Sequence, residues 1–306
     1  MRLMITGGRG MVGRNLCEHP SASGYDILAP TRAELDLADS SAVHAYVASK
    51  KPDMIIHAAG TVGGIQANIE APVKFLMDNL AVGSNLIMAA REAGVMKVMN
   101  IGSSCMYPRD APNPLSENSI LTGRLEPTNE GYALAKIACA KLCAYIRTED
   151  PRFLYKTIVP SNLYGRYDNF HPVRSHMIPA VIRKVHEAKL TGEAVSIWGD
   201  GSARREFMLA SDLADFVYFA IMHYSDMPDM LNVGLGYDYS VLDYYRAVAS
   251  VVGFTGSFIF DTSKPVGMTQ KLMNVDRMEA FGWRAGTNLE SGLTSTYEFF
   301  KSEHLL

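Results

Sequence analysis

The sequence is poor in cysteine, in net charge and in long hydrophobic runs. Its 306 residues include four cysteines, Cys17, Cys105, Cys139 and Cys143, whose spacing fits neither a secreted disulfide framework nor a zinc site. The 29 basic and 32 acidic residues give a net charge of −3, which argues against a general nucleic-acid binder. No apolar stretch approaches the roughly 18 residues of a membrane span, and no basic leader precedes the first strand. We therefore expect a cytoplasmic protein that binds no nucleic acid, membrane or metal.

Apolar strand-like runs alternate with helical stretches through the first half of the chain. The strands are expected near 2–5, 26–29, 54–57, 97–101 and 155–159, with helices between them, including 72–92 and 132–147. This order predicts right-handed crossovers and an α/β fold of the Rossmann type, a doubly wound parallel sheet. After residue 165 the rhythm breaks, although a helix near 212–223 and a strand at 230–233 look like additions to the first sheet. We predict a nucleotide-binding domain at 1–165 with later additions near 210–235, and a smaller discontinuous α/β lobe at 166–306.

A glycine-rich turn follows the first strand and opens a helix. Gly7 permits a tight turn, Gly10 lets the backbone approach a pyrophosphate, and Gly13 lets helix and strand pack closely. Met11 and Val12 begin the helix, whose free N–H groups favour an anion. This pattern predicts a dinucleotide site, and an ordinary glycine-rich strand-to-helix turn is the alternative.

Two arginines indicate which dinucleotide this site binds. An NAD-selective site usually carries an acidic residue after the second strand, but this chain has Arg32 there and a second cation, Arg9, in the glycine loop. Guanidinium groups suit a 2′-phosphate, so we predict NADP(H) rather than NAD(H). The alternative is that Arg32 is a surface cation paired with Glu34 or Asp36.

Tyr132 and Lys136 lie four residues apart, which places both on one face of a helix. A phenol is a poor acid at neutral pH, and a neighbouring ammonium is expected to lower its pKa. Ser103 lies just past the end of the strand 97–101, where ligands of open parallel sheets bind, and its hydroxyl can bond a substrate carbonyl. Without that serine, the Tyr–Lys pair would be interpreted as an ordinary pair on the surface of an amphipathic helix.

Glycine loop, serine and Tyr-x-x-x-Lys, in this order, resemble the extended short-chain dehydrogenase/reductase superfamily. Further motifs, from residue 5 to beyond Lys271 and Trp283, are similar to its GDP-L-fucose synthase family: Val62–Ile65, Gly102–Pro108, Glu126–Glu130, Asn162–Gly165, Asp168–Pro172, Ser175–His176 and Arg205–Phe207. The resemblance implies an NADPH-dependent 3,5-epimerase and 4-reductase that converts GDP-4-keto-6-deoxy-D-mannose to GDP-L-fucose. It also implies a homodimer, built on the helices 72–92 and 132–147.

The resemblance assigns roles to five side chains. A 4-ketone acidifies the protons on C3 and C5, so epimerisation needs a base, an opposing acid and donors for the enolate oxygen. Cys105 would be the base and His176 the acid, while Ser103 and Tyr132 would hold the C4 oxygen and Lys136 would tune the phenol and bind the nicotinamide ribose. From residue type alone, Cys105 could equally be a packed structural thiol.

Candidates for binding the sugar nucleotide lie mostly in the second lobe: Asn162, Lys184, Trp198, Arg205 and Lys271. Trp198 could stack on guanine, and the cations could meet the diphosphate or ribose. Lys184 stands where the family pattern has arginine, so the details of this recognition differ. Two alternatives stay open: a related GDP-keto-deoxy-sugar enzyme of the GDP-L-colitose synthase or deoxyheptose type, and a non-catalytic nucleotide sensor.

Overall fold

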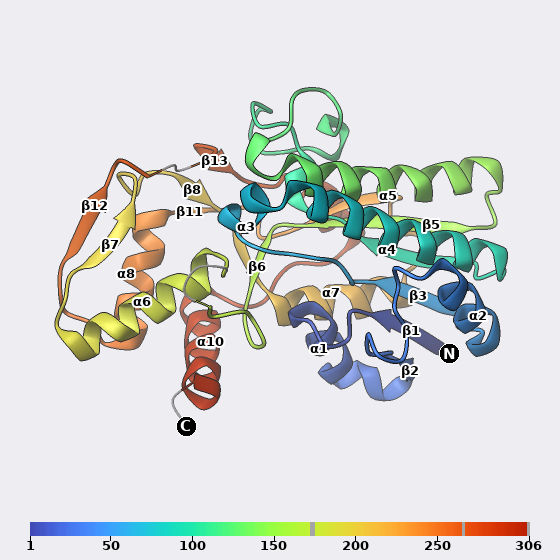
Figure 1. The fold of residues 1–306 in the computed structure, drawn as a ribbon, viewed down its shortest axis with the longest axis horizontal. Coiled ribbons are helices and arrows are strands. Elements are labelled where there is room, and N and C mark those ends of the chain that lie inside the picture. The colour runs from blue at the N-terminus through green and yellow to red at the C-terminus, as the bar shows by residue number, and fades with distance from the viewer. Residues whose placement is uncertain (172–174, 265–266, 305–306) are drawn as a thin grey trace.

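The computed structural model describes residues 1–171, 175–264 and 267–304, so Pro172 of the motif Asp168–Pro172 lies outside the described residues. Its centre is a six-stranded parallel sheet with strand order β10-β5-β4-β3-β1-β2. The strands are β1 (Arg2–Thr6), β2 (Asp26–Leu28), β3 (Met54–His57), β4 (Lys97–Ile101), β5 (Leu154–Pro160) and β10 (Met230–Val233). The flanking helices are α1 (Met11–Glu18), α2 (Ser40–Lys50), α4 (Pro72–Glu92), α5 (Glu130–Glu149) and α7 (Ala210–Met222). The predicted Rossmann-type fold is confirmed (Figure 1).

Helices cover both faces of this sheet because its strands are apolar on both sides. Met4 and Ile55, which are neighbours in the strand register, pack against α2, α4 and α5. The next residues along the two strands, Ile5 and Ile56, point to the other face and pack with residues of α1 and α7. All four side chains are fully buried. The strict alternation fixes the register, since a slip of one residue would exchange the two faces.

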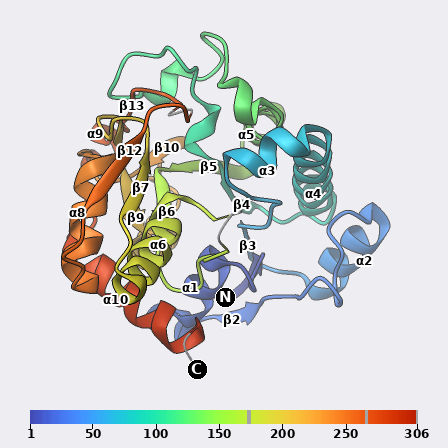
Figure 2. The same cartoon turned by 60° about the vertical axis from the view of Figure 1, so that its left-hand side comes forward.

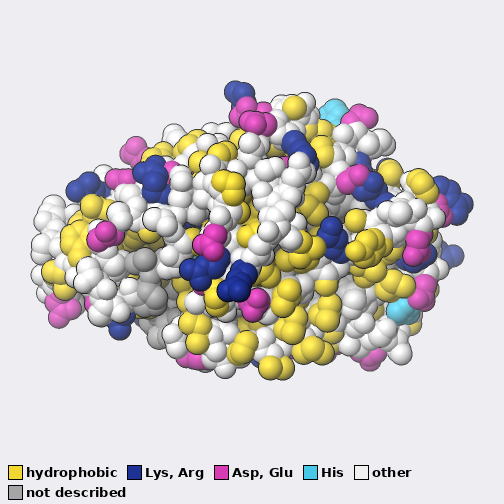
Figure 3. All heavy atoms as spheres, turned by 90° about the horizontal axis from the view of Figure 1, so that it is seen from above, with side chains coloured by type: hydrophobic (Ala, Val, Ile, Leu, Met, Phe, Trp, Pro, Cys, Tyr) yellow, Lys and Arg dark blue, Asp and Glu magenta, His cyan; other side chains and the backbone are white. Residues whose placement is uncertain are grey.

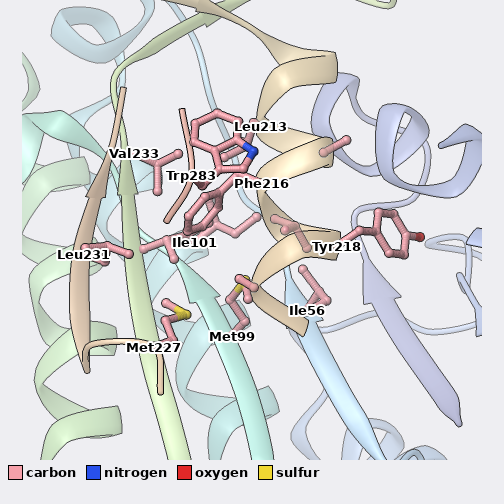
Figure 4. Close-up of a cluster of buried hydrophobic side chains, with 14 of the residues drawn as sticks. Ile56, Met99, Ile101, Leu213, Phe216, Tyr218, Met227, Leu231, Val233 and Trp283 are labelled. Carbon is pink, nitrogen blue, oxygen red and sulfur yellow. The ribbon is translucent and has the colours of Figure 1, made fainter. Parts of the chain in front are cut away.

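Segments late in the sequence complete the sheet, as the sequence predicted. Strand β10 pairs in parallel with β5, and α7 packs beside α1. Within the cluster that covers this face, Phe216 of α7 and Trp283 meet edge to face with ring centroids 5.2 Å apart (Figure 4). Leu231 and Val233 of β10 belong to the same cluster.

A second group of elements lies beside the carboxyl ends of the central strands, at the left of Figure 1. It holds three small sheets, which pair β7 (Val195–Trp198) with β12 (Phe258–Asp261), β6 (Asn162–Tyr164) with β9 (Phe207–Leu209), and β8 (Arg204–Arg205) with β11 (Tyr239–Ser240) and β13 (Gln270–Lys271). The helices α6 (Met177–Thr191), α8 (Val241–Val252) and α10 (Leu289–His304) share one apolar cluster. Two further helices, α3 (Ile65–Glu70) and α9 (Asp276–Phe281), are short. The division of the chain into two domains at residue 165 stays a prediction.

The bounds of one helix differ from those expected. Helix α5 begins two residues earlier and ends two later than predicted, because the turn Pro127–Asn129 leads directly into it. Helix α6 ends at Thr191, and the next residue, Gly192, adopts a left-handed conformation with φ of +77°. Among the helices that the structure describes, none is both long enough and apolar enough to cross a membrane.

Candidate active site

The carboxyl ends of the central strands open into one cavity of about 410 Å³. It is lined by residues of the glycine loop 7–13, of the loop 58–63 after β3, of 101–104 after β4 and of 160–163 at the end of β5, and by Asn68, Phe75, Tyr132, Lys136 and His176. Figure 2 turns the molecule so that the side carrying α6, α8 and α10 comes forward. The fold therefore brings together segments that lie up to 170 residues apart, at the edge where parallel sheets bind ligands.

The glycine loop has the geometry of a dinucleotide cradle. Gly7 has a φ of +72°, and a Cβ atom placed on it would lie 2.9 Å from the Cα atom of Ala59. A Cβ on Gly13 would lie 2.1 Å from the carbonyl oxygen of Gly7, so helix and loop touch. Gly10 precedes α1 without any side-chain cap, which leaves the first N–H groups of the helix available to an anion. These residues fit a pyrophosphate.

Both arginines that were predicted to bind the 2′-phosphate are exposed near this loop. The Arg32 side chain is 86% exposed, and its guanidinium lies 3.7 Å from the carboxylate of Asp36. Arg9 is also exposed, and its charge helps to lower the pKa of Glu34, after the hydrogen bonds from Thr31. Neither arginine lines the cavity. An exposed pair such as Arg32–Asp36 contributes little to stability, so Arg32 can exchange this partner for a phosphate.

Ser103, Tyr132 and Lys136 line the cavity together. The Lys136 amine donates a hydrogen bond to the carbonyl oxygen of Ile101 at 3.0 Å and lies 5.8 Å from the centre of the Tyr132 ring. The expectation that Lys136 lowers the pKa of Tyr132 is wrong for this structure, because burial raises that pKa, as does Cys105, and only a hydrogen bond with Ser103 opposes them. The phenol is protonated at neutral pH, as an unperturbed phenol also is, and burial makes it a weaker acid than usual.

Cys105 and His176 approach the same region from two elements. Cys105 follows β4 in a short 3-10 helix, is 6% exposed, and has its pKa raised by burial, while the charges of Lys271 and Lys136 act in the opposite direction. His176 precedes α6 and lines the cavity, and desolvation of its ring, followed by the charge of Lys271, lowers its pKa. Within the described ranges no group of three His, Cys, Asp or Glu side chains could hold a metal ion.

The residues expected to bind the sugar nucleotide fall into two groups. Asn162 lines the cavity, and its amide donates to the carbonyl oxygen of Glu206 at 2.9 Å. Arg205 and Lys271 are direct partners in the parallel pair β8–β13, so their positive charges lie side by side. Because the charge of Lys271 also influences Cys105 and His176, this pair lies toward the reaction centre.

Lys184 and Trp198 form the other group. Trp198 ends β7 and is 47% exposed, and the amines of Lys184 and Lys264 lie 5.7 and 5.9 Å from its ring. Two ammonium groups beside an exposed indole offer charge for a phosphate and a face for a base. Lys264 was not expected from the sequence, since only its place beside Trp198 singles it out.

Sequence reasoning also missed the part played by Glu206. Its side chain is fully buried, and its carboxylate accepts backbone N–H groups from Leu235, Gly236 and Met273. Burial raises the pKa of Glu206 to about 7, and these hydrogen bonds act against that shift. The carboxylate thus joins the strand that carries Arg205 to the segments after β10 and β13. The motif 205–207 contained this residue, but only the tertiary structure shows what it holds.

Fold and cavity together define a nicotinamide-dependent enzyme with a Rossmann-type sheet. The family model described as "NAD dependent epimerase/dehydratase family" matches residues 3–234, and the chain belongs to this family. The chain is 51% identical to a GDP-L-colitose synthase of Yersinia pseudotuberculosis, over 99% of both chains. It is 50% identical to a GDP-L-fucose synthase of Azorhizobium caulinodans, over 98% of this chain and 96% of the relative.

A solved structure places the fold among enzymes of GDP-sugars. The GDP-mannoheptose C4 reductase of Campylobacter jejuni, solved with NADP bound, superimposes with a TM-score of 0.89 at 31% identity, over 98% of each chain. The resemblance to the GDP-L-fucose synthase family, seen first in the motifs, is confirmed by these relatives. These three relatives are named for three different sugars: colitose, fucose and a mannoheptose.

Proposed function

We propose that this protein is an NADPH-dependent epimerase and reductase that converts GDP-4-keto-6-deoxy-D-mannose to GDP-L-fucose. The observation that carries the proposal is one cavity that joins the glycine loop to Ser103, Tyr132, Lys136 and His176, with Cys105 beside it. The 50% identity to a GDP-L-fucose synthase over nearly the whole chain supports it. A nucleotide sensor would need only the glycine loop, so the retention of all these groups favours an enzyme.

Epimerisation would use groups that this chain itself supplies. Cys105 would remove the proton next to the C4 carbonyl, and the ring N–H of His176 would return a proton on the other face. The hydroxyl groups of Ser103 and Tyr132 would donate to the C4 oxygen while it carries negative charge. Burial raises the pKa of Cys105, and the charges of Lys271 and Lys136 act against that shift, in favour of the thiolate that this step needs.

Reduction would follow in the same cavity. The glycine loop and Lys136 would hold NADPH, which supplies a hydride to C4 when it is bound. Tyr132, whose phenol is protonated near pH 7, would donate its proton to the C4 oxygen. The Lys136 amine, which donates a hydrogen bond to the carbonyl oxygen of Ile101, belongs to a residue that lines the cavity and would be available to a ribose hydroxyl.

A second candidate is a GDP-L-colitose synthase, favoured by the 51% identity to the enzyme of Yersinia pseudotuberculosis. Its ketosugar lacks the C3 hydroxyl, so only C5 would be inverted. A heptose substrate is a third candidate, in view of the Campylobacter jejuni neighbour. The sugar-diphosphate end of all these substrates would meet the same cations, Lys184, Arg205 and Lys271.

The product formed in deuterated water tests the proposal. We expect incubation with GDP-4-keto-6-deoxy-D-mannose and NADPH to consume the cofactor and give GDP-L-fucose with deuterium at both C3 and C5, read by NMR. Turnover of the 3-deoxy ketosugar alone, with deuterium at C5, would assign the colitose reaction instead. Absence of turnover with every ketosugar would leave the protein a nucleotide-binding sensor.

Cofactor preference tests the role of Arg32. We expect wild-type protein to bind NADPH more tightly than NADH, and Arg32→Ala to weaken NADPH binding by roughly tenfold with little effect on NADH. The measurement is the dissociation constant of each cofactor by titration calorimetry. Arg152→Ala is the matched control. Arg152 is an exposed arginine paired with Asp150, and it precedes β5 at the end of that strand farther from the cavity. Equal wild-type affinities for the two cofactors would contradict the predicted selectivity.

The proposed partner, besides the GDP-sugar, is a second copy of this chain. Helices α4 and α5 pack side by side and carry exposed apolar side chains, Val73 and Met77 on α4 and Leu134 and Tyr145 on α5. Figure 3 shows the molecule turned by 90° from the view of Figure 1, so that it is seen from above, and hydrophobic side chains gather there between charged ones. A homodimer formed on these helices would cover this apolar surface.

A further inference from the structure

Glu206 is a buried carboxylate held by backbone N–H groups of two distant segments. Its Oε1 atom accepts from Leu235 and, at 3.2 Å, from Gly236, and its Oε2 atom accepts from Met273 at 2.7 Å. A Cβ atom on Gly234 would lie 2.2 Å from Oε1, so the chain there passes close to the carboxylate. Because a buried carboxylate is costly unless it is hydrogen-bonded, these contacts fix both segments relative to Glu206.

The residue before Glu206 belongs to the pair of cations in the second lobe. Arg205 of β8 is the direct partner of Lys271 of β13, and these strands have two residues each, so they share few hydrogen bonds of their own. Like charges directly opposite each other also destabilise a strand pair. Met273, which donates to Glu206, lies two residues after Lys271. The carboxylate therefore holds β13 against β8 directly beyond the two cations.

Lys271 lies near the proposed base, Cys105. Burial raises the pKa of Cys105, and the charges of Lys271 and Lys136 act against that shift, with the larger effect from Lys271. In return, burial lowers the pKa of Lys271, and Cys105 acts against that shift. The thiolate and the ammonium thus support each other's charge.

Other charged or titratable groups face these three side chains from the surrounding elements. Cys105 or Lys271 is faced by Tyr132 and Lys136 on α5, His176 before α6, Arg205 on β8 and Glu126 before the turn 127–129, and Glu206 is faced by Asp238, Tyr237 and Tyr244. A test of Glu206 therefore needs Lys271 to be varied as well, so that its effect is separated from theirs.

We propose that Glu206 is a positioning residue that keeps the Lys271 ammonium beside the Cys105 thiol, so that Cys105 can remove a proton from the sugar. The inference deepens the proposed function and rests on it. Glutamine at this position would keep the size of the side chain but has one acceptor oxygen, and its NH₂ group would face a backbone N–H. Glu206→Gln therefore loses one side of the contact, while the backbone carbonyl that accepts from Asn162 remains.

The first test is exchange of the C3 and C5 protons of GDP-4-keto-6-deoxy-D-mannose in deuterated water, at saturating sugar and without NADPH, followed by NMR. We expect Glu206→Gln and Lys271→Met each to slow exchange by about tenfold, because each takes a positive charge away from the thiol. The double variant should stay within about threefold of the slower single variant, since both changes remove the same interaction. Independent effects would multiply to about a hundredfold.

The second test follows Cys105 itself and needs no sugar. In protein whose cysteines carry an NMR-active carbon label, the Cβ resonance that disappears in Cys105→Ser reports formation of the thiolate as the pH is raised. We expect the midpoint to move to higher pH in Glu206→Gln and in Lys271→Met. Asp212→Asn is the matched control. Asp212 is another buried carboxylate that accepts a backbone N–H, from Thr287 at 3.1 Å, and its replacement should leave exchange and midpoint unchanged.

The outcomes separate this inference from the proposed function. If Glu206→Gln leaves the midpoint unchanged, or if the two effects multiply in the double variant, Glu206 does not act through Lys271 and the inference alone is overturned. Gly234→Ala, whose Cβ would displace the carboxylate, replaces Glu206→Gln if that variant does not fold. If neither folds, Glu206 serves the fold and the inference is overturned. If the wild type exchanges neither proton, the proposed function fails, and the midpoint of Cys105 still decides whether Glu206 positions Lys271.

Discussion

Cys105→Ser is expected to abolish proton exchange at C3 and C5 of the ketosugar, by at least about a hundredfold. A buried serine hydroxyl is a far weaker base than a thiolate, and the charges of Lys271 and Lys136 that favour a thiolate do little for an alcohol of much higher pKa. The measurement is incorporation of deuterium from deuterated water into the ketosugar, followed by NMR without NADPH, so that reduction does not interfere.

Cofactor binding gives the internal control for this variant. NADPH affinity should stay close to that of the wild type, because Cys105 lies outside the glycine loop. Cys17→Ser, at a half-buried thiol on α1, controls for loss of a cysteine elsewhere and should exchange at the wild-type rate. Normal exchange in Cys105→Ser would return this residue to a packing role, and loss of NADPH binding would show that it supports the fold.

Tyr132→Phe is expected to lose reduction of C4, with NADPH oxidation slowed by at least about a hundredfold. The variant keeps the aromatic ring that packs edge to face on Phe75 and removes only the hydroxyl that donates the proton. Absorbance of NADPH during single-turnover experiments measures this step.

Exchange at C3 and C5 separates proton donation from general damage. It should persist in Tyr132→Phe at a lower rate, because Ser103 can still donate to the C4 oxygen. Tyr145→Phe removes the hydroxyl of an exposed tyrosine on the same helix and is the matched control. Reduction at close to the wild-type rate in Tyr132→Phe would rule out the phenol as the proton donor.

The order of strands and helices along the first half of the chain followed from local patterns. Apolar runs at 54–57 and 97–101 became β3 and β4 with those bounds, because strands buried on both faces are continuously apolar. The strand at 230–233 was also predicted as an addition and pairs with β5. The small sheets of the second lobe could not be predicted, since β8 and β13 have two residues each and their paired residues lie 66 positions apart in the sequence.

The sequence by itself determined the class of the protein, because glycine loop, serine and Tyr-x-x-x-Lys are local patterns that bring their own geometry. The pKa of Tyr132 could not be predicted from the sequence, since burial raises it and burial is set by residues from several elements. Tertiary structure alone brought Lys271 near Cys105 and gave Glu206 its three backbone partners. Each of these depends on contacts between distant segments, which no local pattern encodes.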